Sequence, residues 1–262
     1  TTVGRVIINS FVTGGGSNAK AYNCDFIIQS GGQLNILAND TPPVAAEMLS
    51  AGKKIEVLSG GILSIEGDID VAATASIIVR DGGEMILNQA SINYNHPMWE
   101  GTEIFEGGST VSILDWGFTG AGSGSLINGA STPTISANSN GYIFGNLIVD
   151  ITAAKFTNTW SLVGGSLGIV NLCENNFDIN NESTNFIYGA TNRTGTNGFV
   201  VNGNLTIFDG PFSFGFNFDN NPFNHQFIIN GNFECASNDV LKVNHVNGAL
   251  TNNLSGSVTF KG

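Results

Sequence analysis

The sequence predicts an all-β protein built as a right-handed parallel β-helix, a solenoid in which short strands stack from one turn of the chain to the next. Three observations predict it: an apolar strand followed by a glycine corner recurs, the corners lie 22 to 29 residues apart, and helix signals are scarce. One turn cannot bury its own apolar face, whereas stacked turns build a continuous core. We therefore expect a single elongated domain over residues 1–262, with about ten irregular coils.

In the first half of the chain, each repeat joins two short strands through a Gly-Gly corner. "FIIQSGGQLNIL" (26–37), "IEVLSGGILSIEG" (55–67) and "IIVRDGGEMIL" (77–87) align, and "EIFEGGSTVSIL" (103–114) and "WSLVGGSLGIV" (160–170) follow the same plan. Glycine suits a corner that needs a positive φ. The first glycines of these pairs are Gly31, Gly60, Gly82, Gly107 and Gly164.

A variant with Gly-Asn at the corner occupies the second half. "YIFGNLIVDI" (142–151), "FVVNGNLTIF" (199–208) and "FIINGNFECA" (227–236) fit it, with corners at Gly203 and Gly231. Because all the corners share one phase between apolar strands, we expect them to stack along one edge. The alternative fold is an antiparallel β-sandwich or jelly roll, which also has many short strands and glycine-rich turns.

One segment favours a helix. "PPVAAEMLSAGKK" (42–54) has proline near its start, good helix formers inside and Gly52 near its end. We expect a short helical insertion there.

Composition limits the classes of partner. Only 11% of the residues are charged, against about a quarter in average domains. The net charge is -12 with 9 Lys and Arg, which leaves no basic stripe for nucleic acid or an anionic membrane. No apolar run reaches the roughly 18 residues of a membrane span. The chain starts at Thr1 without a signal peptide, so we expect a segment of a longer precursor.

The three cysteines, Cys24, Cys173 and Cys235, are far apart in the sequence and form no CxxC motif. This spacing does not indicate a zinc or thiol-redox site. We expect them to be buried as small hydrophobic residues.

"GPFSFGFNFDN" (210–220) places phenylalanine at every second position, at Phe212, Phe214, Phe216 and Phe218. On a strand these rings share one face. They form either a core ladder or an exposed platform for a sugar. The small residues between them suit solvent, so we expect the rings to be core.

A polysaccharide-degrading enzyme would need paired carboxylates, or an acidic cluster with a basic residue. The candidate acids are Asp68 with Asp70, and the group Glu100, Glu103 and Glu106. Asp70 sits in "EGDIDVAATA", where exposed acids next to a corner are ordinary solvated residues, and we interpret Asp70 as one of these.

Two further sets of residues have side chains that can take part in catalysis or metal binding. Arg80 beside Asp81 is lyase-like in composition, but we favour a surface ion pair as the explanation. The histidines, His96, His225 and His245, lack HxH or HxxxH spacing, and there is no GxSxG motif. We assign no catalytic, cofactor-binding or metal-binding residue and expect no cofactor.

"IIVRDGGEMILNQASINYNHPMWEGTEIFEGGSTVSIL" (77–114) resembles the coil-and-tryptophan pattern of large secreted surface proteins from Bacteroidetes, and "NGNLTI" (202–207) resembles repeats in their adhesin-like members. Here Glu100 separates Trp99 from Gly101, and Thr102 stands where isoleucine is usual. The resemblance implies a β-helix exported by type IX secretion as part of a longer chain.

These observations together lead us to expect a non-catalytic adhesin or structural module at the cell surface or outside the cell. Its expected partners are adjacent domains of the same precursor, surface glycans or secretion machinery. The alternatives are a polysaccharide lyase or glycoside hydrolase, and a fibre-forming subunit.

Overall fold

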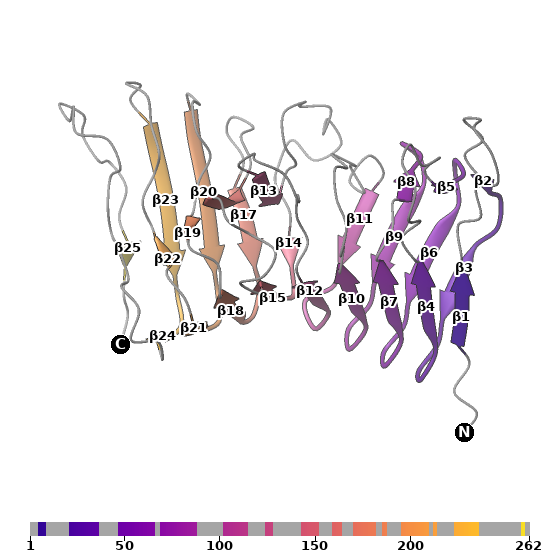
Figure 1. The fold of residues 1–262 in the computed structure, drawn as a ribbon, viewed down its shortest axis with the longest axis horizontal. Coiled ribbons are helices and arrows are strands. Elements are labelled where there is room, and N and C mark those ends of the chain that lie inside the picture. The colour runs from indigo at the N-terminus through magenta and orange to yellow at the C-terminus, as the bar shows by residue number, and fades with distance from the viewer. Residues whose placement is uncertain are drawn as a thin grey trace.

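The structure is a computed structural model, and its regular elements are parallel β-strands (Figure 1). It describes residues 5–8, 21–36, 47–65, 69–87, 102–114, 124–127, 143–151, 159–163, 170–181, 185–187, 195–209, 212–213, 223–235 and 258–259. Within these ranges there is no helix, and each ladder is parallel. The all-β prediction is confirmed, and the antiparallel alternative is not found in the described ranges.

Nine strands form one continuous sheet, here called the long sheet. In spatial order they are β1 (Arg5–Ile8), β4 (Gln33–Ile36), β7 (Ile62–Ile65), β10 (Glu84–Leu87), β12 (Thr110–Leu114), β15 (Asn146–Ile151), β18 (Phe177–Asn181), β21 (Leu205–Asp209) and β24 (Phe233–Cys235). At a strand spacing of about 4.8 Å, nine strands extend over about 38 Å.

A second side of the molecule consists of two sheets in succession. The N-side sheet contains β3 (Phe26–Ile28), β6 (Lys54–Val57), β9 (Ser76–Val79) and β11 (Thr102–Phe105). The C-side sheet contains β14 (Ile143–Phe144), β17 (Val170–Cys173), β20 (Gly195–Val201), β23 (Phe223–Ile229) and β25 (Val258–Thr259).

Two small sheets supply the remaining strands. One contains β2 (Ala21–Tyr22), β5 (Glu47–Leu49) and β8 (Ile69–Val71), and the other contains β13 (Gly124–Ile127), β16 (Thr159–Val163), β19 (Asn185–Ile187) and β22 (Phe212–Ser213). From β2 to β10 and from β13 to β24, the chain visits a small sheet, the second side and the long sheet in that order. Parallel strands therefore stack coil upon coil, as in a solenoid.

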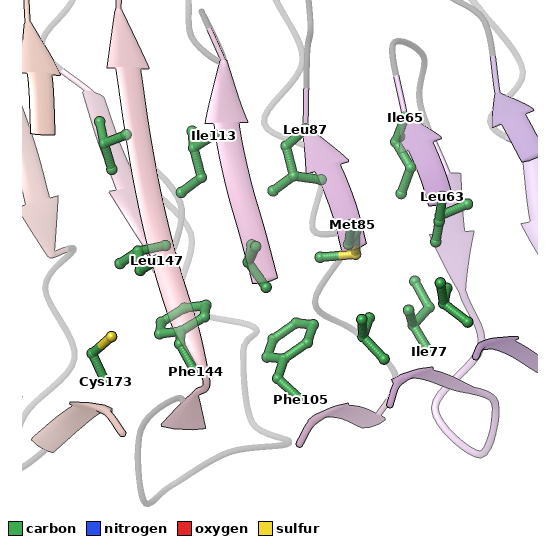
Figure 2. Close-up of a cluster of buried hydrophobic side chains, with 14 of the residues drawn as sticks. Leu63, Ile65, Ile77, Met85, Leu87, Phe105, Ile113, Phe144, Leu147 and Cys173 are labelled. Carbon is green, nitrogen blue, oxygen red and sulfur yellow. The ribbon is translucent and has the colours of Figure 1, made fainter. Parts of the chain in front are cut away.

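The core consists of columns of apolar side chains that run along the stack. In the long sheet, Leu34, Leu63, Met85 and Val111 occupy the same register on successive strands and are almost fully buried. Figure 2 shows this core, with the rings of Phe105 and Phe144 side by side where the N-side and C-side sheets meet. Their centroids are 5.5 Å apart. The alternation of apolar residues seen in the repeats is thus the inward face of each strand.

The predicted corners stack through backbone hydrogen bonds between the second side and the long sheet. Gly31 N donates to Gly60 O, Gly60 N to Gly82 O, and Gly231 N to Gly203 O. These five positions confirm that corners lie along one edge, and Gly164 lies outside the described residues.

Two details of the corner prediction are wrong. Gly82 N donates to Gly108 O rather than to Gly107, because Phe105 and Thr110 are in register with Val79 and Glu84. The alignment of the Gly-Gly pairs is therefore shifted by one residue at this coil.

Among the described glycines, positive φ occurs only in the first half, at Gly31, Gly52, Gly60 and Gly82. In the second half, glycine is needed because coils approach closely. A Cβ on Gly145 would lie 2.5–2.6 Å from the carbonyl oxygens of Glu106, Gly107 and Ser109.

The helix predicted over residues 42–54 is wrong where the structure describes it. Glu47–Leu49 is strand β5, a turn with Gly52 at φ +72° follows, and Lys54 begins β6. Pairing of β5 with β2 and β8 overrides the helix propensity of this segment. Residues 42–46 lie outside the described part.

Alanine substitution separates the two reasons for glycine. Gly31→Ala should lower the free energy of unfolding by about 1–2 kcal/mol, which is the cost of a left-handed residue. No steric cost is added, because no atom lies within 4 Å of the added Cβ. Gly145→Ala should cost about 3 kcal/mol or more, because three carbonyl groups must move. Urea unfolding measures both. Equal losses would show that close coil approach does not constrain Gly145.

Candidate functional site

Charged side chains gather on the outer face of the N-side sheet. Lys54 Nζ lies 2.6 Å from Glu56 Oε2 on the same strand. Arg80, which follows β9, joins its own coil to the coils before and after it, because its guanidinium nitrogens lie 2.6 Å from Glu56 Oε1 and 2.6 Å from Glu106 Oε1. These four residues are called the ion-pair cluster, and their formal charges cancel.

The cluster holds its carboxylates in the ionised form. Hydrogen bonds from Lys54 and then from Arg80 lower the pKa of Glu56 below its ordinary value. Arg80, followed by the backbone N–H of Asp81, lowers the pKa of Glu106. Glu106 and Glu56 raise the pKa of Arg80 in return. Because Arg80 is 40% exposed, solvent screens both of its ion pairs and each contributes little to stability. Because their pKa values are lowered, neither Glu56 nor Glu106 is available as a general acid at neutral pH.

Glu103, in contrast, points into the core. On strand β11 it takes the place that Ile55 and Ile77 occupy on β6 and β9, and only 9% of it is exposed. Neither carboxylate oxygen has a hydrogen-bond partner among the described residues. Burial raises the pKa of Glu103 to about 8, and its own backbone N–H opposes this only partly. The carboxyl is therefore largely protonated at pH 7.

Of the acids predicted from the sequence, the two described members of the glutamate group, Glu103 and Glu106, do not form a catalytic pair. Glu103 and Glu106 lie on strand β11 and just after it, but one faces the core and the other is bound to Arg80. Glu100 and Asp68 lie outside the described residues, and Asp70 lies on β8.

Arg80 pairs with Glu56 and Glu106 across coils, so the predicted partner Asp81 is wrong. Asp81 instead accepts a hydrogen bond from Gly108 N at 2.7 Å through its Oδ1. It therefore belongs to the corner rather than to the ion-pair cluster.

The histidines and cysteines do not converge in the described structure. His225 lies on β23, whereas His96 and His245 lie outside the described residues. Cys173 is buried, as predicted, and burial raises the pKa of its thiol to about 12. Cys24 is exposed, so the prediction of burial is wrong there, and both are free thiols. Cys235 lies on β24.

A ladder of asparagines lines the corner edge in the second half. Asn176 N donates to Asn146 Oδ1 at 3.4 Å, Asn204 N to Asn176 Oδ1 at 3.0 Å, and Asn232 N to Asn204 Oδ1 at 3.0 Å. The intervals of 30, 28 and 28 residues were the signal in the sequence. These amides serve as connectors between coils, a role that the turn chemistry did not predict.

The exposed aromatic ring that the structure describes is Phe208, which is 55% exposed on the outer face of β21. Of the four alternating phenylalanines, Phe212 lies on β22, and Phe214, Phe216 and Phe218 lie outside the described residues. The core prediction for those rings remains a prediction.

The described surface therefore includes the mutually paired charges of the ion-pair cluster, columns of asparagine amides and one exposed aromatic ring. No group of three or more His, Cys, Asp or Glu side chains converges on a metal position within the ranges the structure describes. In the same ranges there is no helix long and apolar enough to cross a membrane. Comparisons with family models, with curated proteins and with solved structures find no match.

Glu103 predicts an unusual dependence of stability on pH. Because its pKa is raised from 4.5 to about 8 in the folded protein, the folded state binds more protons between these values. Its contribution is fully favourable below pH 4.5 and is lost as the pH rises through 8. Glu103→Gln should remove this loss, which is on the order of a few kcal/mol.

Urea unfolding of both proteins at several pH values between 5 and about 9 measures the difference. Glu106→Gln serves as the control, since the Glu106 carboxylate is partly exposed and paired with Arg80. If the difference in free energy of unfolding between wild type and Glu103→Gln were the same at every pH, Glu103 would not be a buried carboxyl that ionises in this range.

Proposed function

We propose that the chain is a right-handed parallel β-helix of about ten coils that serves as a non-catalytic structural or adhesin module of a secreted or cell-surface protein. The continuous nine-stranded ladder of the long sheet carries this proposal. Each described strand pairs only with strands of the coils before and after it, so every added coil lengthens the rod by about 4.8 Å. Such a design suits a part that projects length.

The surface chemistry supports the same proposal. The described carboxylates of the N-side sheet are bound to Arg80 or buried, so they do not form an acid–base pair. Amide groups recur from coil to coil, as in the pair Asn202 and Asn230, whose side chains are joined by a 2.9 Å hydrogen bond. Repeated polar groups suit weak, multivalent contacts with surface glycans or with adjacent domains of the same precursor.

Deletion of a whole coil tests the rod. Removal of residues 204–231 joins Gly203 to Asn232 and brings Phe177 into register with Phe233, since Leu205 pairs with both. We expect a folded protein that is shorter by about 4.8 Å. Circular dichroism melting and small-angle X-ray scattering measure folding and length.

Deletion of residues 204–217 is the control, because half a coil puts every later strand out of phase. It should lower the Tm strongly or abolish folding. If both deletions behave alike, coils are not the modular unit of this protein.

The proposal also predicts no depolymerisation of polysaccharides, with or without added calcium. Assays for new reducing ends and for unsaturated products over a broad glycan panel measure this. Turnover that disappears in Asp68→Asn or Asp70→Asn would overturn the proposal in favour of a polysaccharide-active enzyme.

A further inference from the structure

An aliphatic stripe runs along the outside of the second side of the molecule. On the N-side sheet, the central outward column contains Ile27, Glu56, Ile78 and Ile104 in register. Ile27 is 55% exposed and Ile104 is 44% exposed. Only Glu56 interrupts this column, and its charge is compensated by the ion-pair cluster.

The stripe continues on the C-side sheet. There the outward column contains Ile143, Leu172, Val200 and Ile228, and it ends at Thr259. Ile143 is 52% exposed. The stacked rings of Phe105 and Phe144 hold the two sheets next to each other (Figure 2), so the columns form one stripe of eight strands.

The long sheet does not have such a stripe. Its corresponding column on the side away from the core has six polar residues among eight: Asn35, Ser64, Ile86, Ser112, Ile148, Asp178, Thr206 and Glu234. Three of the polar residues, Asn35, Ser64 and Ser112, are nevertheless almost fully buried. Both sheets have the same backbone geometry, so strand propensity does not account for the difference. An exposed row of aliphatic side chains indicates an interface.

We propose that a second copy of this chain covers the aliphatic stripe, so that two rods pair face to face. The stripe repeats at the strand spacing of about 4.8 Å, and a second copy has the same repeat by construction. The face is about 34 Å long and about 16 Å wide, so pairing buries about 1,100 Å² in total, which is near the lower limit for a specific interface.

Charge selects one of the two symmetric pairings. A two-fold axis parallel to the strands, passing between β11 and β14, reverses the order of the strands. It places Ile104 opposite the second copy's Ile143, Glu56 opposite Val200, and Arg80 opposite Glu174. A two-fold axis along the rod places each Glu56 opposite its own copy, which is unfavourable. The antiparallel pairing is therefore the proposed one.

Sedimentation velocity of the full chain between about 1 μM and about 500 μM tests the pairing, because an interface of this size gives weak association. Wild type should form a dimer within this range. Ile104→Lys and Ile143→Lys should each raise the Kd by about tenfold or more, because each places a charge in the apolar interface. Since both positions are exposed in the single chain, their Tm should stay close to that of wild type.

Phe208→Lys is the matched control, since Phe208 is 55% exposed but lies on the long sheet. It should leave the Kd unchanged. A wild-type monomer at every concentration, as expected if the chain covers its own stripe, would overturn the proposal. The proposal would also be overturned if Ile104→Lys and Ile143→Lys left the Kd unchanged, or if Phe208→Lys raised the Kd by as much as they do.

Cross-linking tests the orientation. Cys24→Ser and Cys235→Ser first remove two of the native thiols. New cysteines are then placed at Ile78→Cys and Leu172→Cys, which are three strands or about 14 Å apart within one chain. In the proposed pair, each of them lies opposite the other residue of the second copy. A bismaleimide that spans roughly 10 Å, the spacing of stacked sheets, should give a covalent dimer of the double variant only. A covalent dimer of Ile78→Cys alone would overturn the antiparallel pairing. The pairing does not depend on the proposed function. If the paired rods degraded polysaccharides, the proposed function would be rejected and the pairing would still stand.

Discussion

The structure depends on the in-register parallel ladder between coils. A strand of three or four residues is too short to be stable alone, and its backbone N–H and C=O groups find partners only on the coils before and after it. The corner follows the same rule: Gly60 donates to Gly82 and accepts from Gly31. Since each coil completes its neighbours, repetition itself stabilises the fold.

Stacking turns single residues into columns, and the columns explain most of the chemistry. Asparagine at one corner position becomes a ladder, isoleucine at one outward position becomes a stripe, and leucine at one inward position becomes core. An ion pair forms across coils when unlike charges occupy one column, as Arg80 and Glu106 do. Binding by such a surface is distributed along a line, which favours a partner that is itself extended.

Glu103 is the exception within a column. It interrupts the inward row of Ile55 and Ile77 at the last strand of the N-side sheet. There the ladder between the second-side sheets ends, while the long sheet continues from β12 to β15. The break in the ladder and the buried carboxyl therefore lie at the same strand, next to the stacked rings of Phe105 and Phe144.

The sequence by itself determined the parallel coils, the phase of most corners and which residues of each strand face inward, because these depend on the two-residue period and on turn chemistry. The alignment of the Gly-Gly pairs instead placed Glu103 opposite Ile78, so the sequence did not predict the inward position of Glu103, which the register with Ile77 decides. Only the tertiary structure decided which residues meet between coils: Arg80 with Glu56 and Glu106 rather than Asp81, Gly82 with Gly108, and β5 in place of a helix. The physical reason is that contacts between coils depend on register, and coils of unequal length shift the register by amounts that no single repeat encodes.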